Sequence, residues 1–550
     1  MLWPLKIVNL LTCLPVCRLK KDFFLCILSA IFLILSFPNF NLWIFAWFGF
    51  VPLFFAIQNK SKTKAFLISY IAGVIFWASV IYWLVHVTLP GTILLILYLA
   101  LYFGFFGLFY TLYAIRYPLI SIPSLWVLLE YIRSHLFTGF PWALLGYSQY
   151  LNLPVIQIAD ITGAAGISFL VMMVNVLIYS VISRKSSVVS SKQRCLLPVL
   201  LLFITLVYGY FKIYYLPLIT YHLPLKISVI QGNIPQELKW DISSRSYILD
   251  RYIQLTEKAV ALKPDLIIWP EASTPGLLGE NNWGFEEVFD LSKKAKIPLL
   301  IGSVVKDGAN YFNSALLVDT EGKVSQRYNK LHLVPFGEYI PFKKTFPFLE
   351  TVVPIGDITA GKEYTVFSGP VSRLAGEPVS RLAGERVDRL AGERVNGLTD
   401  KWVNRQTGKL ANRQTKFSVL ICFEDLFPEL SRRFVKRGAQ FLVNITNDAW
   451  YKKTSASRQH LQASVFRAVE NRLYLARCAN TGISGFIEPT GKIISRVKDE
   501  SGRDTFISGV DTREIGISKK SLSFYTKYGD IFIAICFLFI AISMFFRRAG

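Results

Sequence analysis

Eight stretches of this chain are apolar over the length that a helix needs to cross a lipid bilayer, and this feature constrains the fold most. A spanning helix requires about 20 mostly apolar residues. The stretches are residues 22–37, 41–57, 65–88, 91–115, 119–136, 155–183, 196–216 and 528–546. Hydrophobic residues make up 53% of the sequence and aromatic residues 15%, which is too apolar for an ordinary soluble protein. We therefore predict a multi-pass membrane protein whose α-helical bundle has eight spans.

Basic residues gather at alternate ends of the apolar stretches. They are Arg18, Lys20, Lys21, Lys60, Lys62, Lys64, Arg116, Arg184, Lys185, Lys192, Arg194, Arg547 and Arg548. The connections at the other ends, such as residues 38–41, 88–91 and 137–154, contain no Lys or Arg. Because cytoplasmic loops of membrane proteins are enriched in Lys and Arg, we predict that the basic ends are cytoplasmic. The long polar region, residues 217–527, is then outside the cytoplasm.

This polar region has the pattern of an α/β domain. Short runs rich in β-branched and other apolar residues occur at residues 226–234, 265–271, 297–305, 417–425 and 439–448. Charged stretches compatible with helix separate several of them, which is typical of a sheet with buried strands. We predict a membrane domain with seven helices at residues 1–216, an extracytoplasmic α/β domain at 217–527, and a C-terminal helix with a cytoplasmic tail at 528–550.

Residues 369–416 interrupt this pattern with a short repeat that begins at Val371. The copies read VSRLAGEP, VSRLAGER, VDRLAGER, VNGLTDKW, VNRQTGKL and ANRQTKF. A repeat so short and so rich in Arg, Gly and Glu cannot bury a core. We predict a disordered surface insertion that takes no part in the chemistry.

Charge and cysteine content exclude several classes of function. The formal net charge of +23 is not accompanied by a nucleic-acid-binding motif, so we attribute it to the topology signals. The seven cysteines show no metal-ligand spacing. We therefore expect no metal, no other cofactor and no nucleic-acid partner. Only Cys422 and Cys478 lie in the polar region, and a disulfide bond between them is one interpretation of this pair.

Three reactive residue types stand at the ends of predicted strands. Cys422 follows FSVLIC and precedes FEDLFPEL, so a turn should present its sulfur as a nucleophile. Glu271 ends the run LIIWPE, where a partly desolvated carboxylate can act as a general base. Lys330, in RYNKLHLVPFGEYIP, would favour the thiolate and stabilise a developing oxyanion. Each residue alone is more often a buried cysteine or a solvated charge, but together they predict a catalytic site.

Longer motifs surround these three residues and extend into the apolar region. They are QGNIPQELKW (231–240), WPEAS (269–273), YNK with HLVPFGEYIP (328–341), ICFEDLFPE (421–429), NDAWY (447–451), NTGISG (480–485), TGFPWALLGYSQ (138–149) and the E-x-x-R of Glu130 and Arg133. With the Glu, Lys and Cys they resemble the nitrilase, or carbon-nitrogen hydrolase, superfamily and, within it, the apolipoprotein N-acyltransferase family. The resemblance covers nearly the whole chain apart from the repeat insertion. It implies a nitrilase-like αββα sandwich on a membrane bundle, in a bacterial inner membrane with the catalytic domain in the periplasm.

The resemblance also implies a ping-pong acyl transfer. Cys422 would attack an ester of a phospholipid, with phosphatidylethanolamine as the expected donor, and form a thioester. Glu271 would take the thiol proton, and Lys330 would stabilise the tetrahedral oxyanion. The acceptor would be the N-terminal amine of the diacylglyceryl-cysteine of an apolipoprotein, which is the last step of bacterial lipoprotein maturation.

Five further residues match positions that support or line the site in this family. Glu338 and Glu424 are expected to orient the lysine, and Trp240 and Asn313 to line the site. Core packing is the alternative interpretation of the tryptophan, and a turn is that of the asparagine. Phe423 stands where many members have Tyr, so a role that needs the tyrosine hydroxyl is not expected here.

The segment PFKKTFPFLETVVP, residues 341–354, is predicted to be an interfacial loop. Its residues Phe342, Phe346 and Phe348 would enter lipid and control access to the site. Seating the site at the bilayer surface would also keep water away from a thioester.

Other functions remain open on the sequence alone. A tethered amidase would release ammonia from simple amides, although a single tether would then suffice. A transporter with a regulatory domain would use the spans as a path, although they hold few ionisable groups. A Cys-His pair with His332 or His460 is a third possibility, but the Glu and Lys make a histidine base unnecessary.

Overall fold

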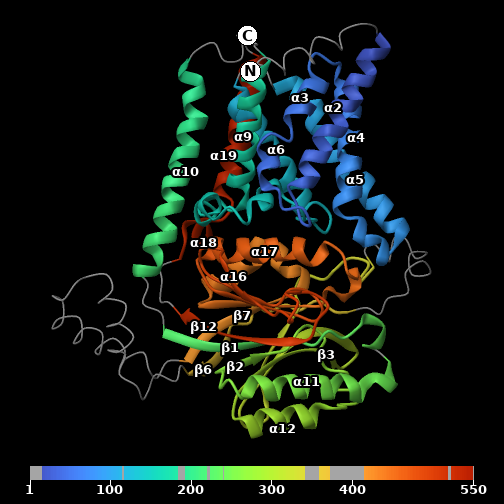
Figure 1. Cartoon of the computed structure of the whole chain (residues 1–550), viewed down its shortest axis with the longest axis vertical. Helices are drawn as coiled ribbons and strands as arrows, with labels where there is room; N and C mark the ends of the chain where they lie inside the picture. Colours follow the sequence, from blue (N-terminus) through green and yellow to red (C-terminus); the bar gives the residue numbers. More distant parts are fainter. Residues whose placement is uncertain are drawn as a thin grey trace, which may run out of the picture.

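The computed structural model describes residues 15–113, 117–183, 192–219, 223–239, 241–340, 358–371, 414–517 and 522–548. Figure 1 shows a helical part at the top and a β-sandwich with its own helices below. Trp240, the predicted interfacial loop at 341–354 and nearly all of the repeat insertion at 369–416 lie outside the described residues. Their predicted roles are therefore not tested by the structure.

The helical part contains long helices separated by short ones. These are α2 (Pro15–Leu35), η1 (Trp43–Trp47), α3 (Val51–Ile57), α4 (Lys62–Val80), η2 (Tyr82–His86), α5 (Leu89–Tyr113), α6 (Pro118–His135), η3 (Leu145–Gln149), α7 (Leu153–Ile156), α8 (Ala159–Thr162), α9 (Ala164–Ile182) and α10 (Lys192–Ile219), followed after the sandwich by α18 (Phe524–Tyr528) and α19 (Ile531–Arg548). The helix α10 stands to one side of the bundle and leads down to the sandwich (Figure 1).

Four helices in the described part of the chain are long and apolar enough to cross a membrane, rather than the eight that we predicted. They are Lys62–Val80, Leu89–Leu112, Ala164–Ile182 and Leu196–Tyr214. The stretch 41–57 is divided into η1 and α3, with Gly49 between them and Pro52 in the first turn of α3. Both residues disfavour one continuous helix. The helix α6 contains Glu130 and Arg133, which lower its hydropathy.

Two six-stranded sheets form the sandwich. The first sheet has the order β12-β1-β2-β3-β4-β5 and the second has the order β11-β10-β9-β8-β7-β6. Their strands are β1 (Leu223–Gln231), β2 (Leu266–Ile268), β3 (Leu299–Asp307), β4 (Asn310–Val318), β5 (Val324–Asn329), β6 (Phe367–Val371), β7 (Gln414–Ile421), β8 (Phe441–Thr446), β9 (Leu475–Ala479), β10 (Gly485–Ile487), β11 (Ile493–Arg496) and β12 (Gly509–Ile517). Parallel strands lie at the centre of each sheet, β1-β2-β3 in one and β7-β8-β9 in the other. All residues of β2 and β8 are buried, as expected for strands that are covered on both faces.

Helices cover the outer face of each sheet, which confirms the α/β prediction. The helices α11 (Arg245–Val260) and α12 (Phe285–Ala295) lie on the side away from the helical part, whereas α16 (Pro428–Lys436) and α17 (Ala456–Asn471) lie between the second sheet and that part (Figure 1). The sequence of α17, ASRQHLQASVFRAVEN, is rich in polar residues, yet all of it except Arg458 is buried. This helix is therefore enclosed by sheet on one side and by the helical part on the other.

A buried ion cluster joins the helical part to the sandwich. Asp160 of α8 accepts hydrogen bonds from Arg472 Nε at 2.9 Å and from Tyr208 Oη at 2.8 Å, and Lys212 Nζ lies 3.2 Å away. The tyrosine and the lysine belong to α10, and the arginine directly follows α17. Removing one partner of such a buried pair leaves an uncompensated charge, so this cluster fixes α10 and the sandwich to the same point.

Candidate active site

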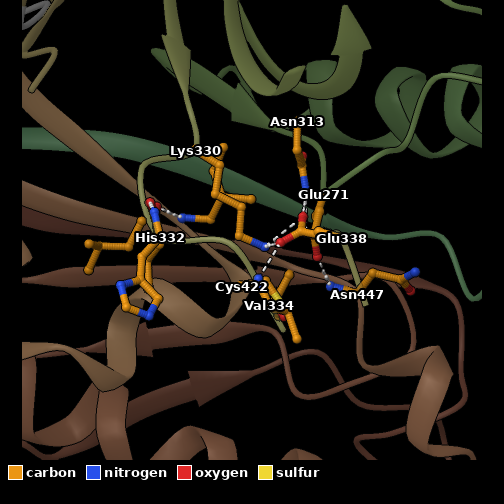
Figure 2. Close-up of polar contacts among 12 residues, drawn as sticks. Glu271, Asn313, Lys330, His332, Val334, Glu338, Cys422 and Asn447 are labelled. Carbon is orange, nitrogen blue, oxygen red and sulfur yellow. Dashed lines mark hydrogen bonds and ion pairs between the residues drawn. The ribbon is translucent and has the colours of Figure 1, made fainter. Parts of the chain in front are cut away.

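Four predicted site residues and Asn447 meet between the two sheets, and each comes from the end of a strand or from the strand itself. Glu271 follows β2, Asn313 lies in β4 and Lys330 follows β5, all in the first sheet. Cys422 follows β7 and Asn447 follows β8 in the second sheet. Figure 2 shows these side chains converging on one point from both sides. The prediction that strand ends bring Glu, Lys and Cys together agrees with this geometry.

A close approach of two strands positions Glu271. A Cβ atom at Gly302 of β3 would lie 2.3 Å from the oxygen of Pro270 and 2.7 Å from Glu271 Cα, so only glycine fits there. The following residue, Ala272, has a φ of 45°, which is unusual for a residue with a Cβ. The ammonium of Lys239 holds this turn by donating to the carbonyl oxygens of residues 271 and 272, at 3.0 and 2.9 Å.

The carboxylate of Glu271 is held on three sides. Asn313 Nδ2 donates to its Oε1 at 2.8 Å and the backbone N–H of Asn447 donates to its Oε2 at 2.9 Å. Lys330 Nζ lies 3.4 Å from Oε1. A fixed, buried carboxylate of this kind is suited to accept a proton from a neighbouring group.

Lys330 bridges two carboxylates. Its Nζ lies 3.4 Å from Glu271 Oε1 and 2.9 Å from Glu338 Oε2, and its side chain is only 1% exposed. Asn313 Nδ2 also donates to Glu338 at 2.8 Å, and the N–H of Val334 donates to it at 2.8 Å. Burial opposes the charge on the lysine, but the two carboxylates outweigh burial and raise the pKa of Lys330 above its ordinary value. The site therefore keeps a permanent cation at neutral pH.

Cys422 occupies a sharp turn from strand to helix. It begins the 3₁₀ helix η6 (Cys422–Leu426) and has a φ of 53°, a left-handed conformation that costs about 1–2 kcal/mol for a residue with a Cβ. Burial and the negative charge of Glu271 raise the pKa of the Cys422 thiol well above its ordinary value, although Lys330 acts in the opposite direction. Lys330 thus favours the thiolate, as predicted, but burial outweighs its effect. The resting sulfur keeps its proton and must lose it during attack.

Glu424 ties the nucleophile turn to the loop that carries the lysine. Its carboxylate accepts from the hydroxyl of Tyr328 at 2.8 Å, from the N–H groups of Leu331 and His332 at 2.7 and 3.1 Å, and from the N–H of Ile421 at 2.7 Å. Burial raises the pKa of Glu424 to about 7 against these donors and the charge of the nearby lysine, all of which lower it. These contacts fix the turn of Cys422 and the loop of Lys330 relative to each other.

Family models match most of the chain. Residues 29–177 match the apolipoprotein N-acyltransferase N-terminal domain, and residues 226–519 match the carbon-nitrogen hydrolase domain. The apolipoprotein N-acyltransferase of Geobacter metallireducens is 37% identical, with 96% of each chain covered. This chain belongs to the apolipoprotein N-acyltransferase family. The family member of Pasteurella multocida is 30% identical, with 87% of this chain and 88% of that relative covered.

Solved structures of the nitrilase superfamily also resemble this apolipoprotein N-acyltransferase family member. Saccharomyces cerevisiae Nit3, a member of branch 10 of that superfamily, is 16% identical, and the match covers 54% of this chain and 91% of that chain with a TM-score of 0.36. An amidase from Nesterenkonia sp. is 17% identical, with 54% of this chain and 93% of that chain covered and a TM-score of 0.35.

The other residues that the sequence suggested for the site of this apolipoprotein N-acyltransferase family member form no hydrogen bond with Glu271 or Lys330 in the described part of the chain. Cys422 and Cys478 are both free, so the interpretation that they form a disulfide bond is wrong. Phe423 is buried, and its ring lies 5.2 Å from that of Phe427. The ring of His332 is tilted against that of Phe427, with the ring centroids 3.7 Å apart, and points away from the lysine (Figure 2).

Two residues of the site were missed although their motifs were recognised. Asn447 begins NDAWY, and Lys239 lies in QGNIPQELKW. The asparagine acts through its backbone N–H, which carries no side-chain signal in a sequence. The lysine was passed over because a lone lysine in a polar segment is usually solvated, whereas burial lowers the pKa of Lys239 to about 8 here.

Replacing Glu424 by glutamine is expected to loosen the loop that carries Lys330. The amide would present an NH₂ group to donors that now meet a carboxylate, at a cost of about 1–3 kcal/mol of folding free energy. We expect a lower midpoint of thermal unfolding and transfer slowed about tenfold, measured on purified protein in detergent. Glu500→Gln, at an exposed glutamate, is the matched control. Equal behaviour of the two variants would show that Glu424 supports nothing.

Proposed function

We propose that this chain transfers a fatty acyl group from a phospholipid to the N-terminal amine of diacylglyceryl-cysteine in apolipoproteins, through a thioester on Cys422. Its family membership supports the reaction class. The observation that carries the chemistry is the group of Glu271, Lys330 and Glu338 beside the cysteine, because it places a base and a cation at a buried sulfur.

The first half-reaction forms the thioester. As the sulfur of Cys422 attacks the ester carbonyl carbon, Glu271 takes the thiol proton and a C–S bond forms. The carbonyl oxygen becomes an oxyanion, which the charge of Lys330 stabilises. When the intermediate collapses, the C–O bond to glycerol breaks, the glycerol oxygen takes the proton from Glu271, and the lysophospholipid leaves.

The second half-reaction regenerates the thiol. The α-amino group of the acceptor attacks the thioester carbon and passes a proton to Glu271, so that a C–N bond forms. The C–S bond then breaks, and the sulfur recovers its proton from the same carboxylate. Because Cys422 is only 7% exposed, the thioester is kept from bulk water, which slows its hydrolysis.

The charge pattern and the helical part support the membrane arrangement that we propose. Besides the four helices that satisfy length and hydropathy, α2, α6, α19 and the η1–α3 segment complete eight spans. Residues 1–216 form the membrane domain, 217–527 the catalytic domain and 528–550 the last span with its tail. The catalytic domain is periplasmic on a bacterial inner membrane, and phosphatidylethanolamine is the acyl donor.

The test is a search for the acyl-enzyme. Purified protein incubated with dipalmitoyl phosphatidylethanolamine, without acceptor, should gain a palmitoyl-sized mass on Cys422 that hydroxylamine removes. Addition of a diacylglyceryl-cysteine peptide should discharge it to the peptide. Cys422→Ala is the control, and Cys478, which is buried away from Glu271 with its thiol directed at the oxygens of Ile230 and Ile268, should remain unmodified. Absence of the adduct, with release of ammonia from simple amides, would instead identify a tethered amidase.

A further inference from the structure

His460 lies directly behind the nucleophile. Its Nε2 is 3.3 Å from the carbonyl oxygen of Cys422 and 2.9 Å from Asp425 Oδ1, and its Nδ1 is 2.9 Å from Asp448 Oδ1. Because both ring nitrogens face carboxylates, which can only accept hydrogen bonds, both nitrogens carry hydrogen. The single Nε2–H is thus shared between Asp425 Oδ1, the nearer acceptor, and the peptide carbonyl of the catalytic cysteine.

The surroundings of His460 keep it charged. Arg477 also contacts both carboxylates, with Nη1 3.2 Å from Asp425 and Nη2 3.4 Å from Asp448. Burial and the arginine oppose a second positive charge, but the two aspartates raise the pKa of His460 to about 9. Two cations and two carboxylates form a balanced, completely buried cluster, in which neither nitrogen of the histidine is left over for proton transfer with substrate.

The carbonyl that His460 contacts is that of Cys422, whose backbone has a left-handed conformation. Besides the histidine, Asn444 Nδ2 donates to the same oxygen of Cys422 at 3.3 Å. The positive φ of the cysteine sets the direction of its Cα–Cβ bond and hence of the sulfur. Donors on the carbonyl resist rotation of this peptide, so they control where the sulfur stands relative to Glu271.

The residue before the histidine is bound to the helical part. Gln459 Oε1 accepts from the indole N–H of Trp83 at 3.0 Å and of Trp142 at 2.8 Å. Its Nε2 donates to the carbonyls of Val80 and Pro38, at 3.0 and 3.3 Å. These four partners come from the helical part, so α17 is fixed there one residue away from His460.

The E-x-x-R motif explains how Trp142 is held. Arg133 Nη1 donates to the carbonyls of Phe140 and Trp142, at 2.7 and 2.8 Å, and Glu130 Oε1 accepts the N–H of Leu145 at 2.6 Å. The motif therefore fixes both ends of the segment that carries the tryptophan. The ring of Trp142 lies 5.6 Å from that of His460, so three contacts lead from Arg133 through Trp142 and His460 to the nucleophile.

We propose that His460 is a positioning residue that holds Cys422 in its attacking orientation, and that Trp142, through Gln459, sets the position of His460 from the helical part. This inference rests on the proposed thioester mechanism. It follows that formation of the acyl-enzyme depends on the contact between the two parts of the chain, and not only on the residues that touch the substrate.

The test compares donors at one position. His460→Leu removes the donor to the Cys422 carbonyl, whereas His460→Gln keeps an N–H donor. We expect the leucine variant to slow acyl-enzyme formation at saturating phosphatidylethanolamine on the order of 100-fold, as for a displaced reactive group, with an unchanged KM for the lipid. The glutamine variant should recover to within about tenfold of the unmodified chain. Alkylation of Cys422 by iodoacetamide, measured without lipid, should follow the same order.

Trp142→Phe tests the link to the helical part without removing charge from the cluster. It keeps a ring but loses the N–H to Gln459, and we expect acylation to slow about fivefold to tenfold, again without a change in KM. The matched control is Gln462→Leu, which removes a contact from α17 to the carbonyl of Tyr147 but none to the nucleophile, and should stay within about twofold of the unmodified chain.

Equal rates for His460→Leu and His460→Gln, or for Trp142→Phe and Gln462→Leu, would overturn the proposal. If the leucine variant does not fold, the comparison of His460→Gln, Trp142→Phe and Gln462→Leu still decides it. Failure of the thioester mechanism itself looks different, because the unmodified chain would then form no adduct on Cys422. Iodoacetamide alkylation would still report the position of the thiol in that case.

Discussion

Glu271→Gln is expected to reduce acyl transfer by on the order of 10³–10⁴, within the range that general base catalysis supplies. The glutamine keeps the size of the side chain and an oxygen for the N–H of Asn447, now at 2.9 Å from the carboxylate. It cannot take a proton from the thiol, and the pKa of Cys422 is raised well above its ordinary value by burial, so the sulfur does not ionise by itself at neutral pH. Both half-reactions should therefore fail.

The measurement is the rate of the hydroxylamine-sensitive adduct in a single turnover, followed by transfer to a diacylglyceryl-cysteine peptide. Glu280→Gln makes the same change on an outlying glutamate that contacts Lys306 at 3.5 Å and should transfer at the normal rate. An adduct that forms on Glu271→Gln within about tenfold of the normal rate would mean that another group removes the proton.

Lys330→Met should lower both the transfer rate and the stability. The variant leaves the carboxylates of Glu271 and Glu338 without the cation that now lies 3.4 and 2.9 Å from them. Breaking a buried pair by removing one partner costs about 3–5 kcal/mol of folding free energy. Because the oxyanion also loses the positive charge that stabilises it, transfer should slow by on the order of 10²–10³. Thermal unfolding and single-turnover kinetics in detergent measure the two effects separately.

The double variant Lys330→Met with Glu338→Gln separates the two roles of the lysine. Neutralising Glu338 removes the repulsion between the carboxylates, so the midpoint of unfolding should recover most of its loss. The transfer rate should not recover, because no cation faces the oxyanion. Recovery of the rate together with the stability would show that the lysine only holds the fold.

The site was predictable because its chemistry is carried by residues at strand ends. Glu271 and Cys422 each follow an apolar run whose strand is one of the parallel strands at the centre of a sheet. Lys330 instead follows β5, a polar edge strand that pairs antiparallel with β4. Asn313 was found only through the family resemblance. Its contacts with two carboxylates depend on the pairing of β4 with its neighbours, which local sequence does not encode.

Other features needed the three-dimensional structure. Fewer helices than apolar stretches meet the criteria of length and hydropathy, because a stretch such as 41–57 breaks into short helices that stay largely buried. The protonation of Cys422 depends on the balance between burial and two opposite charges, and sequence shows the charges without the burial. The contacts of His460 could not be predicted either. Its partners Asp425 and Asp448 lie on other segments of the chain, and the polar sequence of α17 is typical of an exposed helix.

The burial of α17 between the second sheet and the helical part has a consequence for the evolution of this enzyme. Among its residues only Arg458 reaches solvent. A catalytic domain produced without the helical part would therefore expose the face of α17 that packs on it. Gln459 and Gln462 would also lose their hydrogen-bond partners in the helical part. A gene truncated to the hydrolase half should therefore yield aggregates instead of a free-standing amidase. Deletion alone is not a route from this architecture to a soluble hydrolase.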